Sequence, residues 1–251
     1  MCTVSWRSSL DGGYQLFFNR DEQRSRPRAK RPQEFCTNGR RYIAPIDEKS
    51  DGSWIAVNDL GVCAFLLNNY EAANGHFEPA KPFRSRGEIP LSLCGENGIA
   101  RSSDALNGIE KERFPPFFAG IIGPNTPCQI YGWDGRQFGK LSLELPFLTT
   151  SSFQSKAVQA YRKDRYLEVV RSSADEKALF AYHCDSAHEN RAFNPLMSRT
   201  DAETHCISSI SVDSKLAKFE YREVDPLQGS LRSPMSIELR LATGNIPDPG
   251  N

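Results

Sequence analysis

The sequence predicts one α+β domain whose strands are mostly joined by tight turns. Short runs in which apolar and polar side chains alternate recur along the chain, and turns rich in Gly, Asn and Asp separate them. Helical patterns interrupt these runs twice, each time as a pair. Of the 251 residues, 39% are hydrophobic, which is enough to bury one core, and no repeat or linker divides the chain. We therefore expect a single domain over residues 1–251, with an irregular tail from about residue 226.

The first hairpin is formed by the beginning of the chain. Residues 2–6 alternate as a strand, residues 11–13 form a turn, and residues 14–18 read as the returning strand. Antiparallel pairing brings the residues that follow Phe18 back to the start of the chain. We therefore expect Arg20 and Asp21 to lie within reach of Cys2.

The later elements follow from the same signals. Further strands are expected at residues 41–45, 54–58, 62–67, 117–122, 129–133, 139–144, 208–212 and 218–223. Helices are expected at residues 86–94, 102–111, 154–171 and 174–183. Ser102, Ser103 and Asp104 are interpreted as the cap of the second helix, and residues 71–81 as a loop.

The charge balance gives no case for a polyanionic partner. Acidic and basic residues number 31 each, so we expect neither nucleic acid nor an acidic membrane surface to bind. A local basic stretch follows residue 22, and we interpret it as a solvated loop rather than as an anion or polar-substrate site. Its members are Arg24, Arg26, Arg28, Lys30, Arg31, Arg40 and Arg41.

The chain carries no sign of export or membrane insertion. Polar residues interrupt any apolar run near its beginning, and no window approaches the ~20 apolar residues of a membrane span. Seven cysteines at irregular spacings are typical of reduced thiols rather than of a disulfide framework. We expect a cytoplasmic protein; its oligomeric state does not follow from the sequence.

Cys2 is the most informative single residue. Methionine is usually trimmed before a residue as small as cysteine, and trimming would give Cys2 a free α-amine. An amine with a pKa near ~8 beside a thiol with a pKa near ~8.5 makes a nucleophile with its own base. Arg20 would lower the pKa of the thiol and Asp21 would orient the amine. The alternative is that Cys2 is only the small apolar start of a buried strand, with Arg20 and Asp21 in a local ion pair.

Six short motifs, in this order along the chain, resemble those of the NRDE family, also called the transport-and-Golgi-organisation family. They are Cys2 with Asn19-Arg20-Asp21-Glu22, Ser25-Arg26-Pro27, the segment 51–57, Leu67-Asn68-Asn69-Tyr70, Ser85-Arg86-Gly87-Glu88, and Ser198-Arg199-Thr200. The family is similar to N-terminal-nucleophile hydrolases of the penicillin acylase and bile-salt hydrolase type. The resemblance implies a four-layer αββα sandwich of two antiparallel sheets.

The resemblance also implies site residues. Asn69 matches the asparagine that donates a hydrogen bond to the oxyanion in these hydrolases. The alternative is that Asn69 is an ordinary turn asparagine. Arg199 is expected to bind a carboxylate or to bias the pKa values of the site, unless it forms an ordinary ion pair. One departure concerns residues 148–152, where Thr150 and Ser151 stand in place of a second catalytic asparagine. A hydroxyl would then have to substitute for the amide.

The functional prediction is an amide hydrolase or acyl-transfer enzyme that acts on a small-molecule amide or acyl substrate through Cys2, with no cofactor and no metal. The predicted catalytic set is Cys2, Arg20, Asp21, Asn69 and Arg199. The alternative is a non-catalytic haem or lipid carrier, because family members have been associated with such roles. His183 and His205, each followed by a cysteine, would be the haem ligands, although their spacing matches no zinc template.

Overall fold

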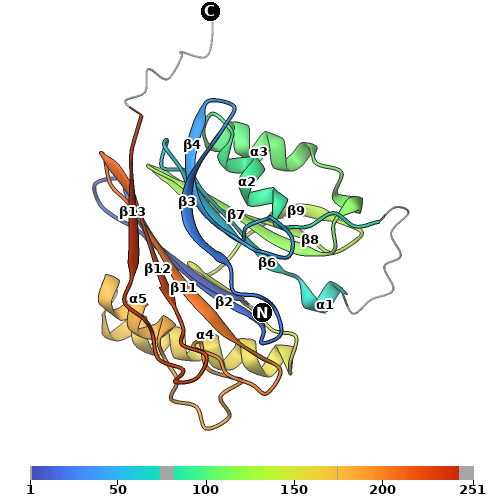
Figure 1. Cartoon of the computed structure of the whole chain (residues 1–251), viewed down its shortest axis with the longest axis vertical. Coiled ribbons are helices and arrows are strands. Elements are labelled where there is room, and N and C mark those ends of the chain that lie inside the picture. The colour runs from blue at the N-terminus through green and yellow to red at the C-terminus, as the bar shows by residue number, and fades with distance from the viewer. Residues whose placement is uncertain (1, 74–81, 174, 243–251) are drawn as a thin grey trace, which may run out of the picture.

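The protein is described from a computed structural model, which covers residues 2–73, 82–173 and 175–242. Two antiparallel sheets pack face to face, and helices cover both outer faces (Figure 1). The first sheet has the order β10 (Phe147–Thr150), β1 (Cys2–Ser8), β2 (Tyr14–Gln23), β11 (Ala202–Val212), β12 (Leu216–Glu223) and β13 (Met235–Arg240). The second has the order β3 (Lys30–Thr37), β4 (Arg40–Ile46), β5 (Ile55–Asn58), β6 (Cys63–Asn68), β7 (Phe117–Gly123), β8 (Thr126–Trp133) and β9 (Phe138–Leu141).

Four helices form the two outer layers. Helices α4 (Ser155–Ser172) and α5 (Glu176–His183) cover the first sheet. Helices α2 (Glu88–Cys94) and α3 (Ile99–Gly108) cover the second. The four-layer αββα sandwich is therefore confirmed.

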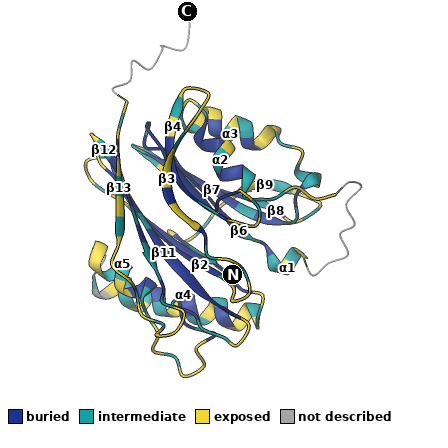
Figure 2. Ribbon diagram, in the orientation of Figure 1, coloured by how far each residue is buried: buried dark blue, intermediate teal, exposed yellow. Residues whose placement is uncertain are grey.

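Alternation along β1 and β2 divides their side chains between two cores. Val4 and Leu16 point inward and pack with Phe65 of the opposite sheet. Phe17 points outward and packs with Tyr166 and Tyr182 of the helical layer. Because successive side chains of a strand face opposite sides, both faces of the first sheet are covered at β1, β2 and β11, whose residues are mostly buried, whereas β13 is largely exposed (Figure 2).

The first hairpin has the predicted register. Cys2 is the direct partner of Arg20 across β1 and β2, and Cys2 also pairs with Thr150 of β10. A tight turn joins β5 and β6, which correspond to the strands expected at residues 54–58 and 62–67. Gly61 there has a φ of +70°, which glycine adopts without strain, and the Asn58 side chain accepts hydrogen bonds from the backbone of Leu60 and Val62.

Three strands were not predicted, and all lie at or near sheet edges. The basic stretch was expected to be a loop, but its residues Lys30–Thr37 form edge strand β3, whose mostly exposed side chains and proline hide the alternation. Strand β10 is only four residues long. The expected irregular tail is wrong over Met235–Arg240, which forms β13 by pairing with β12; residues 243–251 lie outside the described part.

Two helical predictions also need correction. The expected loop from residue 71 begins with helix α1 (Tyr70–Ala73), and residues 74–81 lie outside the described part. Helix α3 begins three residues before the expected cap, so Ser102 lies within it. The Ser102 hydroxyl donates to the carbonyls of Leu93 and Gly98 instead of capping the helix, which is the back-bonding that buried serines make inside helices.

No described helix combines the length and the apolar composition needed to cross a membrane. All seven cysteines lie in the described part of the chain, and each is a free thiol.

Candidate active site

Cys2 lies at the open end of the sandwich, where β1 begins. The pairing with Arg20 and Thr150 puts these three side chains on the inner face of the first sheet, and Cys2 is half-buried against the inter-sheet core. The local cause is the period-two alternation that also turns Val4 and Trp6 inward. The thiol therefore faces the space between the two sheets and not the helical layer.

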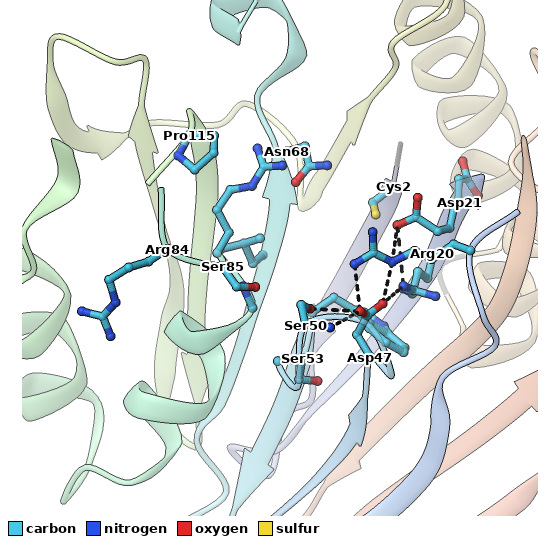
Figure 3. Close-up of a pocket in the computed structure, with 17 residues that line it drawn as sticks. Cys2, Arg20, Asp21, Asp47, Ser50, Ser53, Asn68, Arg84, Ser85 and Pro115 are labelled. Atoms are coloured by element: carbon cyan, nitrogen blue, oxygen red, sulfur yellow. Dashed lines mark hydrogen bonds and ion pairs between the residues drawn. The ribbon is translucent and has the colours of Figure 1, made fainter. Parts of the chain in front are cut away.

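A pocket of about 270 Å³ opens beside the thiol (Figure 3). Figure 3 shows Cys2, Arg20 and Asp21 on one wall and Asn68, Ser85 and Pro115 across from them. The lining residues come from both sheets and from the segment before α2; they are Cys2, Arg20, Asp21, Glu22, Arg26, Asp47, Ser50, Gly52, Ser53, Trp54, Leu66, Asn68, Arg84, Ser85, Arg86, Gly87 and Pro115. The lining is thus dominated by charged and polar groups.

Arg20 is held in a charge cluster on one side of the pocket. Its guanidinium donates to the Asp47 carboxylate at 2.5 Å and lies 4.4 Å from the centre of the Trp54 ring. Arg26 binds the same carboxylate with two hydrogen bonds of 2.8 Å. Burial disfavours ionisation of Asp47, but the hydrogen bonds from Arg26 and the charge of Arg20 outweigh it and lower the pKa of Asp47 to about 2.

Asp21 belongs to a second charge cluster on the opposite face of β2. Its carboxylate is fully buried, lies 3.3 Å from a guanidinium nitrogen of Arg162, and accepts a 2.7 Å hydrogen bond from the Thr204 hydroxyl. Burial raises the pKa of Asp21, and the Arg162 charge opposes that rise. Thr204 reaches Asp21 because a bulge at residue 205 shifts the pairing between β11 and β2, so that Cys206 faces Arg20 while Thr204 faces Asp21.

Arg162 is the residue of this site that the sequence did not reveal. It lies on α4, has no exposed surface, and donates to the Thr3 hydroxyl at 2.8 Å and to the Asn194 carbonyl at 2.7 Å as well as to Asp21. A single arginine in a polar helix carries no signal in one sequence. A fully buried guanidinium needs such a set of acceptors, so Arg162 fixes the position of Asp21.

The surroundings of Cys2 keep its thiol protonated near neutral pH. Burial raises the pKa of Cys2 to about 11, the Asp21 charge also raises it, and Arg20 lowers it by less. Arg20 therefore acts in the expected direction, but burial outweighs it. A thiol in this setting needs a base for activation, and Met1, whose removal would free the α-amine, lies outside the described residues.

Asn69 and Arg199 are not among the residues that line this pocket. The Asn69 side chain donates to the Trp133 carbonyl at 3.4 Å and accepts from the backbone of Ala72, so it caps α1 beside a separate pocket of about 60 Å³. Arg199 forms an ion pair with Asp201 and lies 5.2 Å from the Phe153 ring, at another surface pocket. The neighbouring Asn68 lines the Cys2 pocket instead.

Thr150 stands where the sequence departs from the expected asparagine. It is the direct partner of Cys2 on β10, and its buried hydroxyl has no hydrogen-bond partner among the described residues. Buried hydroxyls are rarely left in this state. The departure has therefore put an unpartnered hydroxyl on the residue that pairs with Cys2, at the pocket of about 60 Å³ that Thr150 lines together with Asn69.

Neither histidine of the haem alternative lines the Cys2 pocket, although His205 Nδ1 lies 3.4 Å from the Arg20 guanidinium. His183 is fully buried, and its ring nitrogens lie 2.8 Å from the Ser5 hydroxyl and 2.7 Å from the Asn19 amide oxygen. His205 is 2% exposed, and its Nε2 has no partner among the described residues. In the same part of the chain, no group of three or more His, Cys, Asp or Glu side chains is arranged to hold a metal ion.

Solved structures with this architecture define the class of fold. A mutant of conjugated bile acid hydrolase from Clostridium perfringens superposes with a TM-score of 0.55 at 10% identity, covering 95% of this chain and 92% of its own. The N-acylethanolamine-hydrolyzing acid amidase orthologue of Caenorhabditis elegans also gives 0.55, at 11% identity over 84% of this chain and 92% of its own. Penicillin V acylase from Agrobacterium tumefaciens gives 0.50, at 12% identity over 96% and 92%. The chain therefore has the fold of the N-terminal-nucleophile hydrolases.

A family model places the chain more narrowly than the shared fold does. The family model for transport and Golgi organisation 2 matches residues 1–225, so the chain belongs to that family and the resemblance drawn from its motifs is confirmed. Comparison with curated protein sequences gives no significant match.

Proposed function

We propose that the protein is a hydrolase or acyl-transfer enzyme for small amides, with Cys2 as its nucleophile. The observation that carries the proposal is the Cys2 thiol in a pocket with Arg20 and Asp21. The fold it shares with amide-hydrolysing enzymes supports the assignment. The pocket is also of a size and polarity that suit a small polar ligand.

The proposed reaction begins with removal of Met1. The freed α-amine of Cys2 takes the thiol proton. It is the base that the thiol needs, because burial raises the pKa of the thiol. The thiolate then attacks the carbonyl carbon of the amide, and the C–N bond breaks as the amine leaves with that proton. Water, or an acceptor in acyl transfer, releases the acyl group from the thioester and returns the thiol.

Two further groups have roles in this proposal. The Thr150 hydroxyl, adjacent to Cys2 and without another partner, donates to the oxyanion that forms during attack. It takes over the donor role that the resemblance assigned to Asn69, whose side chain is engaged elsewhere. Asp21, fixed by Arg162, orients the freed amine.

The lining does not favour the carrier alternative. Haem and lipid tails need extensive apolar contact, whereas Trp54, Leu66 and Pro115 are the only large apolar side chains among the described residues that line the Cys2 pocket. His183 is already bonded at both ring nitrogens. Haem titration of the wild-type protein is therefore a useful comparison for the turnover experiment, and haem binding that is lost on replacing His183 or His205 would favour the carrier.

Turnover of an amide library by processed protein tests the proposal. Cys2→Ala should lose at least about 10³-fold in kcat/KM while keeping its fold, because the nucleophile and its base act as one unit. Cys2→Ser should fall between wild type and Cys2→Ala, and Asp21→Asn should lose about 10- to 100-fold. Cys36→Ala, at an exposed cysteine of β3, is the matched control.

Intact-mass spectrometry accompanies these measurements. Active protein should have lost one methionine. Full activity in protein that retains Met1, or unchanged turnover in Cys2→Ala, would contradict the proposed mechanism.

A further inference from the structure

Among the four arginines of the Cys2 pocket, Arg86 differs from the other three. Arg20 and Arg26 share the Asp47 carboxylate, and Arg84 pairs with Glu88. Arg86 donates to the Pro116 carbonyl at 2.8 Å, and it forms no ion pair with any carboxylate in the described part of the chain. One neutral acceptor leaves most of the donor capacity of a guanidinium available.

The charge balance of the lining leads to the same residue. Two carboxylates, Glu22 and Asp47, face the four arginines, because the third acidic residue of the lining, Asp21, has no exposed side-chain surface. Asp21 is neutralised from the helical layer by Arg162, and Glu22 lies 3.6 Å from both Arg20 and Arg26. With Arg84 bound to Glu88, the pocket keeps an excess positive charge at Arg86.

The position of Arg86 is set by a tight backbone contact. A Cβ on Gly52 would lie 2.6 Å from the Gly87 carbonyl carbon, so the segment before α2 packs directly on the loop that carries Asp47 and Ser50. Ser53 donates to the Gly87 carbonyl at 2.9 Å and fixes the contact. Arg86 precedes Gly87, and the adjoining Ser85 lies on the wall across the pocket from Cys2 (Figure 3).

Burial makes an unneutralised guanidinium costly at this point. Arg86 is half-buried, and burial lowers its pKa, while the nearby Tyr70, Cys2 and Glu22 oppose that change. Buried charges in proteins are generally paired, and a guanidinium matches planar oxyanions with two parallel hydrogen bonds. An oxyanion on a bound ligand would supply the pairing that the described residues do not.

We propose that Arg86 binds a carboxylate of the substrate, so that the pocket selects small amides that carry an anionic group while their carbonyl faces Cys2. This inference rests on the proposed function for the reaction, but the anion preference is testable without turnover. A pocket of about 270 Å³ lies just below the roughly 300–1,000 Å³ typical of drug-sized ligands, so the substrate is small.

A pair of alkylating reagents tests the preference at Cys2 itself. Iodoacetate and iodoacetamide have the same size and leaving group and differ in one carboxylate. Both need the same thiolate, so the ratio of their rates at Cys2, mapped by peptide mass spectrometry near pH 9, is independent of the pKa of the thiol. Arg86→Gln should lower the iodoacetate-to-iodoacetamide ratio about tenfold, and Arg86→Lys should lower it less.

The control is Arg101→Gln, at an exposed arginine of α3, which should leave the ratio unchanged. A ratio in Arg86→Gln equal to that of wild type, in protein with a normal unfolding transition, would overturn the inference. If the ratio falls as expected but no amide is turned over, the anion site stands and the proposed amide hydrolase fails.

Equilibrium binding gives a second measurement in the Cys2→Ala background, where no turnover interferes. N-acetylglycine should bind about tenfold more tightly than its neutral counterpart N-acetylglycinamide, and Arg86→Gln should remove that difference. Equal affinity for the charged and neutral acetylglycine ligands would contradict the proposed carboxylate site.

Discussion

Two consecutive residues of β2, Arg20 and Asp21, enter charge clusters of different kinds. Arg20 faces the pocket, where its partner Asp47 also binds Arg26 and the cluster borders open space. Asp21 faces the helical layer, where it and Arg162 have no exposed side-chain surface. The pocket cluster is in position to respond to a ligand, whereas the helix-side cluster fixes the geometry of the strand end. One strand thus supplies both a binding group and its rigid support.

The largest expected effect comes from breaking the helix-side cluster. Arg162→Met leaves Asp21 buried without a countercharge, so the free energy of unfolding should fall by about 3–5 kcal/mol. The double variant Arg162→Met with Asp21→Asn removes both charges and should recover much of this loss. Urea unfolding at pH 7 measures both. A loss below about 1 kcal/mol in the single variant would show that the cluster is not the support inferred here.

Two histidines, one on each side of the first sheet, sharpen the comparison through pH. Burial lowers the pKa of His183 and that of His205 to about 3, with Arg162 adding to the effect at His183 and Arg28, Arg20 and Arg24 at His205. Both residues are therefore neutral in the folded protein. Their contribution to stability is fully present above about pH 6.5 and is lost as the pH falls toward 3, because only the unfolded chain takes up the protons.

The expected slope is about 1.4 kcal/mol per pH unit for each histidine below about pH 6.5. Urea unfolding between pH 7 and pH 5 measures it, and His205→Gln should reduce the slope by about half. His188→Gln is the control, because His188 lies outside both charge clusters and is not fully buried. A slope unchanged in His205→Gln would mean that this histidine is protonated in the folded protein.

The smallest effect is expected at the pocket cluster. Asp47→Asn should lower the free energy of unfolding by about 1–2 kcal/mol at pH 7, because the pKa of Asp47 is lowered to about 2 in the folded state. The lowered pKa stabilises the folded protein above about pH 4, and that stabilisation is lost as the pH falls toward 2. The gap between wild type and variant should therefore narrow below pH 4.

Asp201→Asn provides the matched control for this measurement. Asp201 also pairs with an arginine, Arg199, but its side chain is 61% exposed, so its replacement should have little effect on unfolding. If both variants lose the same stability at pH 7, the partly open pocket cluster behaves as an ordinary surface ion pair.

The sequence predicted those parts of the site that depend on strand alternation and turns within a short stretch. It did not predict the parts that depend on contacts between distant segments. The hairpin register brings Cys2 beside Arg20, as the alternation and the turn indicated. Asn69 was expected beside the thiol, but it directly follows β6 and caps α1, while Asn68, the last residue of β6, lines the pocket. Because side chains alternate along a strand, a shift of one residue at its end exchanges the asparagine that faces the pocket for its neighbour.

The sequence by itself determined most of the strands, the four longer helices, the family and the nucleophile candidate, because these depend on periodicity, turn chemistry and ordered motifs within short stretches. Only the tertiary structure decided which charges meet. Arg162 contacts Asp21 across 141 positions of sequence, and Thr204 contacts it at a bulge. Arg86 has no carboxylate partner among the described residues, because the neighbouring acids pair with other arginines. The strength of an ion pair depends on the distance between the two charges and on how deeply they are buried. Neither quantity can be read from the order of the residues.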